Sequence, residues 1–440
     1  MSSRVETRTL VAVMLVYITR MLGLFMILPV LVLNQDQYAG ATPLLIGIAL
    51  GAYGLAQALF QVPMGRLSDR LGRKKIILGG LVLFALGSLV AAMADHIWVL
   101  ILGRTLQGAG AISAALLALL SDSSREQNRS KLMAILGVSI GASFGLAMIL
   151  GPLMSAEYGI SSIFWLCILL ALAGGLAIWR LTPETAQDSP TFITEPVEQP
   201  LVQTELRRLN LGIFSLHTAQ MALWLVVPLL LLESYGVAEQ DHWLWYLIAV
   251  GGGFFTMAPV MQALARRNRF KATLLSGIFA IGLAQLMMSG NLPFALFIGA
   301  LVVFFWGFNL LEATLPSLVS KWVEEQQRGR AMGWYSACQF AGTFVGGALG
   351  GFVYGQFGLQ AVFLFALLLV LVWFVVALGT KPLPQLRSFV IAPLAPEQLQ
   401  ALAASSGVLS VRQYPADRET LVRVDMDRVA QETLQQFGLS

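Results

Sequence analysis

Long apolar runs alternate with short polar connections along most of the chain. Each run is close to the roughly 20 residues that a helix needs to cross the hydrocarbon core of a bilayer. The runs lack the period-two alternation of strands in a membrane barrel. We therefore expect an α-helical membrane protein with twelve transmembrane helices, near residues 9–33, 44–66, 75–94, 97–121, 131–154, 161–181, 209–233, 242–264, 272–289, 294–320, 329–354 and 359–379.

The composition favours the same class of protein. Hydrophobic residues occupy 57% of the 440 positions and charged residues 12%, about half the charged share of a soluble domain. Cys167 and Cys338 both lie in apolar runs, so they indicate neither a disulfide framework nor a metal site. The first run is too long for the core of a signal peptide and is expected to remain as the first span.

Lysine and arginine are concentrated in every second connection. The connections after the even-numbered runs contain or are flanked by basic residues, whereas those after the odd-numbered runs contain none. Basic connections face the cytoplasm in most membrane proteins. We therefore expect both termini to be cytoplasmic. The basic residues are explained by topology, so we expect a lipid bilayer and no nucleic acid as partner.

The chain divides into two similar halves. A polar segment with prolines, Thr182 to Glu205, interrupts the apolar pattern, and the stretch Arg125–Gly137 has a counterpart in Glu324–Ser336. Repeats in the same orientation are typical of transporters whose halves are related by an axis along the membrane normal. The predicted domains are two six-helix bundles, 1–181 and 208–380, a cytoplasmic linker, 182–207, and a cytoplasmic domain, 381–440.

The last domain has a different pattern. Three stretches alternate as half-buried strands do, and two read as helices, in the order βαββα. This order resembles a small α+β ferredoxin-like domain without its last strand. It has no CxxC pair, so we expect it to carry no metal. Regulation of the membrane domain and a purely stabilising role are both open.

Three motifs carry a family resemblance. "GRLSDRLGRKK" (Gly65–Lys75) resembles the signature loop of the major facilitator superfamily, and "RTLQGAGA" (Arg104–Ala111) its fourth-helix motif. "AMILGPLMSA" (Ala147–Ala156) resembles the fifth-helix motif of the antiporter branch, with Ala147, Ser155 and Ala156 where glycine is usual. The whole chain resembles the YajR-type transporters of the bacterial inner membrane. The resemblance implies alternating access between two halves, in a protein that we expect to function as a monomer.

The same resemblance assigns a gating latch. In the superfamily the signature loop holds the cytoplasmic side closed against helix eleven, which would begin here near Gly329. The residues implied are Gly65, Asp69 and Arg73, and Asp122 is the nearest acidic partner that the sequence offers Arg73. The alternative is that the cations only fix the topology.

Small residues predict where the helices approach closely. Gly342, Gly346 and Gly350 are spaced four apart in helix eleven, and Gly47 and Gly51 in helix two. Such spacing lets helix backbones approach in lipid. We expect these glycines to join the two halves, with packing inside one half as the alternative.

Ionisable residues inside apolar runs are the strongest indication of chemistry, because each costs about 2.5–3.5 kcal/mol on insertion scales. His217 and Glu312 each lie nine residues from a basic residue at their helix ends, Arg208 and Lys321. The equal depth allows them to pair. Histidine titrates near neutral pH, so we predict that His217 and Glu312 couple transport to protons. The alternatives are a static ion pair and direct contact with substrate.

Two arginines complete the predicted proton-coupling group. Arg20 would bind an anionic group of the substrate or pair with Glu312 across the cavity. Arg104 matches the arginine of the fourth-helix motif, which the resemblance links with proton movement, and a structural role bonded to the backbone is the alternative. The predicted substrate cavity combines apolar and amide side chains: Tyr17, Phe25, Tyr53, Gln57, Gln61, Gln107, Gln220, Trp224, Asn309 and Gln339.

These observations favour proton-coupled export, by antiport, of small amphipathic or drug-like compounds. An uncoupled facilitator, a proton symporter for a sugar or nucleoside, and a membrane sensor remain alternatives. The sequence has no GxxxxGK[ST] phosphate loop, which disfavours a primary pump. We expect no enzyme activity, cofactor or metal. The expected partners are a small-molecule substrate and protons.

Overall fold

The structure is a computed structural model that describes residues 3–124, 126–183, 200–266, 269–323, 325–381, 386–414, 419–426 and 429–437. The chain separates into two compact units, Met1–Thr380 and Lys381–Ser440. Each is described by itself.

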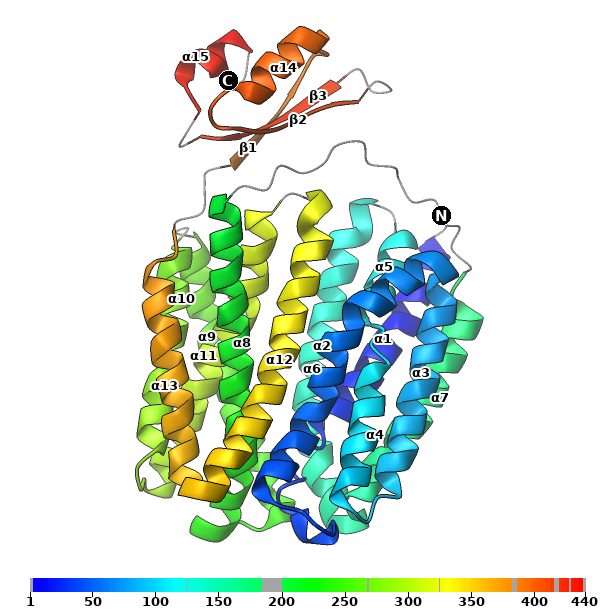
Figure 1. Ribbon diagram of the computed structural model, residues 1–440, viewed down its shortest axis with the longest axis vertical. Coiled ribbons are helices and arrows are strands. Elements are labelled where there is room, and N and C mark those ends of the chain that lie inside the picture. The colour runs from blue at the N-terminus through cyan, green and yellow to red at the C-terminus, as the bar shows by residue number, and fades with distance from the viewer. Residues whose placement is uncertain are drawn as a thin grey trace. The chain divides into compact units, whose positions relative to one another are not determined.

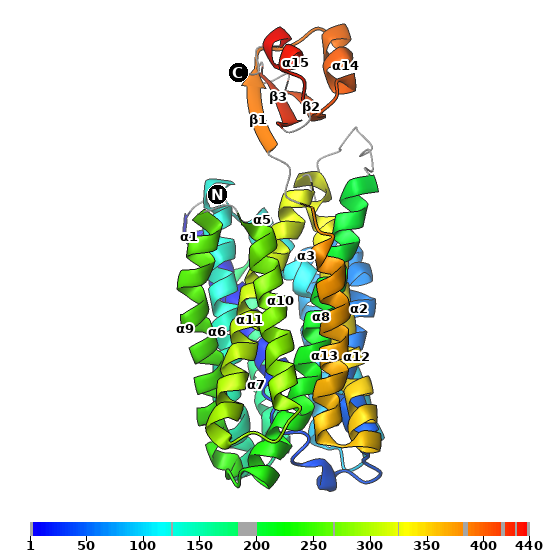
Figure 2. The same ribbon diagram turned by 90° about the vertical axis from the view of Figure 1, so that its left-hand side faces the viewer.

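The first unit is a bundle of long helices that run roughly along one common direction (Figures 1 and 2). Its first half contains α1 (Ser3–Phe25), α2 (Pro43–Leu71), α3 (Arg73–Ala92), α4 (Ile97–Ala109), α5 (Ser113–Asp122), α6 (Glu126–Tyr158) and α7 (Ser161–Leu181). Its second half contains α8 (Pro200–Leu229), α9 (His242–Arg266), α10 (Phe270–Met288), α11 (Phe294–Trp322), α12 (Glu325–Phe357) and α13 (Leu359–Leu378). Short helical turns are η1 (Gln35–Gln37), η2 (Leu230–Ser234) and η3 (Glu239–Asp241).

Within the described residues, eleven segments are long and apolar enough to cross a membrane. They cover all the predicted runs except 329–354, which corresponds to α12. This segment forms a helix of 33 residues. Its many glycines and polar side chains make it less apolar than the other spans.

The fourth predicted span is interrupted where the sequence suggested one helix over 97–121. The chain leaves the helical conformation at residues 110–112, between α4 and α5. A side chain at Gly108 would overlap the backbone of α2 at Tyr53, and one at Gly110 would overlap α3 at Gly80. The close approach of α2 and α3 therefore requires these glycines. The break also leaves the Gly110 carbonyl free to accept a hydrogen bond from Arg20.

Other helix ends also differ from the predictions. The helix of the first span ends at Phe25, and turns follow to Asn34. Helix α8 begins at Pro200, inside the segment predicted as a linker, and passes into the π-helical η2 two residues after Pro228.

Glycines bring α12 into backbone contact with both of its neighbours. Figure 1 shows α12 between α8 and α2. A side chain at Gly342 or Gly346 would overlap the α8 carbonyls of Phe214 or Thr218. The predicted glycine spacing of helix eleven therefore packs inside its own half, which corrects the expectation that it joins the halves. Contact with α2 is made by the adjacent face of the same helix.

That adjacent face carries Gly347 and Gly351. A side chain at Gly47 would overlap the Gly347 carbonyl, and one at Gly351 would overlap the Pro43 carbonyl. Gly51 likewise meets the backbone of Phe344. The two predicted glycines of α2 thus do lie between the halves.

The halves are packed together at the end away from the Gly65–Lys75 loop, which we call the far end. There Asn34 Nδ2 donates to Ser155 Oγ over 3.0 Å, and Ser155 Oγ donates to Glu239 Oε1 of the second half over 3.1 Å. At the other end, which we call the basic end, a side chain at Gly329 or Gly333 of α12 would meet open space. Figure 1 also shows α2 and α12 diverging toward this end, so the halves are closed at the far end and apart at the basic end.

The second unit contains a sheet and two helices. Along the chain the elements are β1 (Leu386–Ile391), α14 (Pro396–Ala404), β2 (Val408–Tyr414), β3 (Glu419–Asp425) and α15 (Gln431–Gln436). The three strands are antiparallel in the order β1-β3-β2. Leu402, Val422 and Val424 form the buried core, because alternate residues of β3 point toward the helices.

Candidate functional site

The Gly65–Lys75 loop forms a tight turn between two spans. Helix α2 ends at Leu71 and α3 begins at Arg73, with only Gly72 between them. Gly72 has φ of 99°, a left-handed conformation that glycine adopts without steric cost. The turn places Arg73 beside the last turn of α2.

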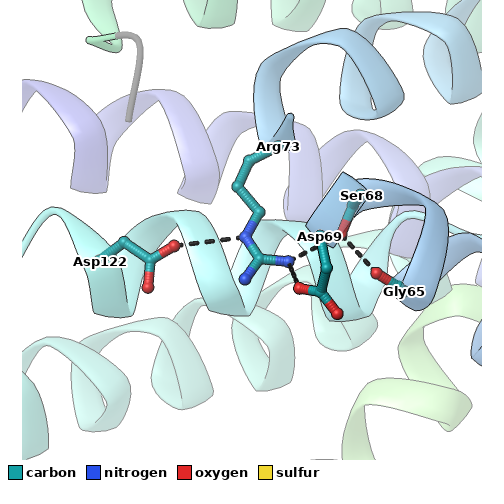
Figure 3. A network of polar contacts seen from close by, with 5 residues as sticks. All are labelled: Gly65, Ser68, Asp69, Arg73 and Asp122. Carbon is teal, nitrogen blue, oxygen red and sulfur yellow. Dashed lines mark hydrogen bonds and ion pairs between the residues drawn. The ribbon is translucent and has the colours of Figure 1, made fainter. Parts of the chain in front are cut away.

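Arg73 joins three helices at the basic end (Figure 3). Its Nε donates to Asp122 Oδ2 of α5 over 3.2 Å, and its Nη1 donates to Ser68 Oγ over 2.9 Å and also to Asp69. Ser68 Oγ in turn donates to the Gly65 carbonyl over 2.7 Å. The four predicted latch residues thus lie in one cluster inside the first half. No hydrogen bond of this cluster reaches α12 among the described residues.

Arg20 is buried in the first half, with 1% of its surface exposed. Its Nε and Nη2 donate to the Tyr53 hydroxyl over 3.2 and 2.8 Å, and Nη1 donates to the Gly110 carbonyl over 2.9 Å. Nη2 also donates to Gln57 Oε1. All of these partners are neutral and belong to the first half. Arg20 therefore does not pair with Glu312 in this structure, contrary to one of the two predicted roles.

Arg104 also lies against the Tyr53 ring and is fully buried. Its Nη1 donates to Gln107 Oε1 over 2.8 Å and to the Gly23 carbonyl over 3.1 Å. Its Cζ lies 5.3 Å from the centre of the Tyr53 ring, and that of Arg20 lies 5.8 Å away. We call Arg20, Tyr53, Gln57, Arg104 and Gln107 the arginine network.

The second half holds a different polar centre. His217 Nε2 of α8 lies 3.1 Å from Glu312 Oε2 of α11. Gln339 of α12 approaches both, because its Nε2 lies 2.8 Å from His217 Nε2 and 3.2 Å from Glu312 Oε1. The structure thus brings together the two residues expected to pair. It adds Gln339, which the sequence placed only in the cavity lining. We call these three residues the histidine–glutamate cluster.

This cluster is only partly shielded. The Glu312 side chain is 39% exposed, whereas that of His217 is 10% exposed. The ring of Phe308 meets the His217 ring edge-on, with 5.6 Å between ring centres. A proton or a cation from solvent can therefore reach the carboxylate while the imidazole stays packed.

Aromatic rings are in contact across the boundary between the two halves. Phe144 of α6 lies 4.8 Å from Phe25, and 6.4 Å from both Trp224 and Phe305 of the second half, measured between ring centres. Phe25 and Trp224 were predicted cavity residues, whereas Phe144 and Phe305 were not. No charged or amide side chain marked them in the sequence.

The remaining predicted cavity residues are mostly enclosed. Tyr17 donates to the Ser113 carbonyl over 2.9 Å, and Gln57 donates to Gln61 over 3.2 Å. Gln220 is buried and Asn309 half-buried. Tyr17, Gln57 and Gln61 are thus held in hydrogen bonds of the first half, whereas Gln220 and Asn309 lie on α8 and α11 of the second half.

A pocket of about 570 Å³ lies elsewhere, between α1 and α6. The serine hydroxyls in its wall donate to their own helix backbone, Ser139 to Leu136 and Ser143 to Ser139, each over 2.7 Å. The wall is consequently apolar. No sequence pattern marked this pocket, because its residues are ordinary span residues: Met14, Ile18, Ile135, Val138, Ser139, Ala142, Ser143 and Leu146.

Known proteins resemble the chain at the levels of sequence and fold. It is 40% identical over 402 residues to the inner membrane transport protein YajR of Escherichia coli, covering 90% of this chain and 87% of that protein. It is 24% identical to the multidrug resistance protein MdtH of Yersinia enterocolitica over 75% of this chain and 81% of that protein.

Two further similarities are more limited. A class H tetracycline resistance protein of Pasteurella multocida is 31% identical over 34% of this chain and 38% of its own length. The crystal structure of the human organic anion transporter MFSD10 superposes with a TM-score of 0.63 at 18% identity, covering 86% of this chain and all of that one. That likeness concerns the fold.

The sequence model of the Major Facilitator Superfamily matches residues 13–317 and 209–413. Together these matches span both helical halves and agree with the signature loop and the eleven apolar spans. The chain belongs to the Major Facilitator Superfamily of transporters.

Proposed function

We propose that the protein is a proton-coupled exporter of small amphipathic compounds that works by alternating access. The observation that carries the proposal is the 3.1 Å contact between His217 and Glu312. A histidine titrates near neutral pH, and a carboxylate inside a membrane protein is expensive unless it serves function. A proton bound by this pair on one side of the membrane would be released on the other.

The basic connections favour a cytoplasmic basic end by the positive-inside rule. On this orientation both termini are cytoplasmic, and the structure corresponds to a state open to the cytoplasm. We take α12 as the twelfth span, because it runs the length of the bundle between α2 and α8.

The Arg73 cluster would act as the latch of the opposite state. When the basic ends of the halves approach, the start of α12 near Gly329 would meet Asp69 and Arg73. Open space around Gly329 and Gly333 in the present state is consistent with a disengaged latch.

The proposed substrate class combines an apolar body with a polar or cationic group. The apolar α1–α6 pocket and the aromatic rings around Phe144 suit the apolar body of such a compound. The partly exposed Glu312 carboxylate suits its polar or cationic group. The names of two relatives, a multidrug and a tetracycline resistance protein, support this class.

For the second unit we propose a ferredoxin-like domain that lacks its fourth strand. The strand order β1-β3-β2 leaves β1 at the edge where a further strand would pair. We propose a cytoplasmic, regulatory role, tested by deleting residues 381–440 and comparing the pH dependence of transport.

The transport proposal is tested in proteoliposomes with an imposed pH gradient. Ethidium, a fluorescent amphipathic cation, serves as the probe. His217→Ala and Glu312→Gln should abolish the gradient-driven component of ethidium flux. Glu233→Gln, the same chemical change at an exposed carboxylate of η2, serves as control and should retain it. Gradient-driven flux at the wild-type rate in both cluster variants would contradict the proposal, and ethidium flux that ignores the gradient in the wild type would favour a facilitator.

A further inference from the structure

The hydrogen bonds of the histidine–glutamate cluster cannot all form in one protonation state. His217 Nε2 lies 3.1 Å from Glu312 Oε2 and 2.8 Å from Gln339 Nε2. A neutral imidazole nitrogen either carries a hydrogen or offers a lone pair. The contact with the Gln339 amide nitrogen requires the lone pair, because that nitrogen is only a donor. The contact with an ionised Glu312 requires the hydrogen.

Gln339 fits best when no proton sits on His217 Nε2. The two hydrogens of its amide then serve two acceptors, His217 Nε2 at 2.8 Å and Glu312 Oε1 at 3.2 Å. In this state His217 Nε2 and an ionised Glu312 Oε2 face each other as two acceptors. Two acceptor atoms that face each other without a hydrogen between them repel, so His217 Nε2 and Glu312 Oε2 together favour binding of a proton.

A proton between His217 and Glu312 disturbs Gln339. When Nε2 carries the proton, it donates to Glu312 Oε2 as a charge-assisted hydrogen bond. An N–H of Gln339 then opposes an N–H of His217. If the Gln339 amide rotates so that its Oε1 faces His217, that oxygen lies against Glu312 Oε1. The hydrogen bond between Gln339 and Glu312 is then lost. Gln339 must give up at least one partner in either case.

Gln339 sits where such a change reaches the other half of the protein. The next residue on α12, Phe340, places its carbonyl against Gly54 of α2. Two residues further, the Gly342 carbonyl accepts from Thr218 Oγ1 of α8 over 3.1 Å. Helix α12, which carries Gln339, is thus in direct contact both with α8, which carries His217, and with α2 of the other half.

On the basis of the proposed function, we propose that Gln339 is the positioning residue that senses the proton shared by His217 and Glu312 and transmits its presence through α12 to the contact with α2. The proton comes from the solvent at the open side, binds between His217 Nε2 and Glu312 Oε2, and returns to solvent after the halves exchange access. Gln339 neither gains nor loses a proton in this cycle.

Other titratable groups around the cluster are few among the described residues. The Tyr335 hydroxyl of α12 lies close enough to Glu312 for their charges to interact. Helix α13 carries no charged residue. The remaining charged or titratable groups on the packed helices lie nearer the helix ends, except Cys338 beside Gln339 and Tyr53 in the middle of α2: Glu205, Arg207 and Arg208 on α8, Arg66, Asp69 and Arg70 on α2, Lys321 on α11, and Arg328, Arg330 and Tyr354 on α12.

The first measurement follows the infrared ring band of protonated His217 against pH in lipid, identified by its loss in His217→Ala. Gln339 donates to the carboxylate and to the imidazole lone pair, so it favours the proton-free state of both. Gln339→Leu should move the midpoint of the band to higher pH by about one unit. Gln339→Asn, whose amide is too short to reach both partners, should move it in the same direction. Ser336→Ala, one turn away on α12, should leave it in place.

The second measurement tests transmission. Spin labels at Leu71→Cys and Arg328→Cys, in a background with Cys167→Ala and Cys338→Ala, report the separation of the halves at the basic end. Acidification across the midpoint should change the ratio of open to closed molecules by about tenfold when Gln339 is present, and by less than about twofold in Gln339→Leu.

An unchanged midpoint together with an unchanged distance response in both Gln339 variants would overturn the inference. The proposed function fails separately, when both His217→Ala and Glu312→Gln keep wild-type gradient-driven ethidium flux. Loss of that flux in Glu312→Gln with a normal response in the Gln339 variants would reject only the role of Gln339.

Discussion

The two halves hold contrasting polar centres. In the arginine network every hydrogen-bond partner of Arg20 is neutral and close, and the side chain is 1% exposed. In the histidine–glutamate cluster the side chains of Glu312 and Gln339 compete for a single ring nitrogen of His217, and Glu312 is 39% exposed. A guanidinium keeps its charge at any physiological pH, whereas a histidine near a carboxylate does not.

The difference between the two polar centres indicates that they have different roles. A charge that cannot titrate and already has its acceptors serves to hold α1 against α2 and the α4–α5 break. His217, Glu312 and Gln339 cannot form all of their hydrogen bonds at once, so this cluster has more than one stable arrangement. We therefore expect the first centre to govern stability and the second to govern the response to pH.

The largest expected effect on stability belongs to Arg20→Met. The substitution leaves the Gly110 carbonyl, the Tyr53 hydroxyl and the Gln57 amide without their donor, at a cost of about 3 kcal/mol. Thermal unfolding in detergent measures the loss, and Arg20→Lys should be intermediate because it retains a charged donor. The pH dependence of flux in surviving protein should remain. The expected difference between the two centres would be wrong if Arg20→Met left the stability unchanged. It would also be wrong if Glu312→Gln lowered the stability by as much as Arg20→Met.

A smaller effect is expected where the halves meet. A side chain in Gly47→Val would overlap the Gly347 carbonyl and disfavour closure of the far end. The ratio of open to closed molecules there should change by about tenfold, or 1.4 kcal/mol. Spin labels on the exposed Met93→Cys and Phe357→Cys report the separation. Gly79→Val, where a side chain meets open space, is the matched control, and an equal change in both variants would show that the α2–α12 contact does not set the equilibrium.

The smallest effect on stability is expected at the Arg73 cluster. Asp69 and Asp122 are 54% and 43% exposed, so solvent screens their ion pairs with Arg73. Asp122→Asn should lower the free energy of unfolding by less than about 1 kcal/mol. A thermal melt beside Asp36→Asn, at an acidic residue of η1, checks this. A loss above about 2 kcal/mol would mean that the cluster is a structural anchor rather than a movable latch.

Much of the site could be anticipated from individual residues, but its third member could not. His217 and Glu312 are rare residues in apolar spans, and their equal distance from basic helix ends indicated a common depth. Gln339 is an ordinary amide in a helix rich in small residues. Only the packing of α12 against α8 and α11 brings its Nε2 within hydrogen-bond distance of both.

The sequence by itself determined the eleven strongly apolar spans, the division of basic and neutral connections, and the signature loop with its acidic partner, because hydrophobic length and charge act locally along the chain. Tertiary structure alone decided how each helix is rotated about its axis. One residue of rotation turns a helix face by about 100°, and this separates Gly346, which packs on α8, from Gly347, which packs on α2. The same freedom decided that Arg20 bonds within its own half and that Gln339 completes the histidine–glutamate cluster, since neither partner choice is encoded by neighbouring residues.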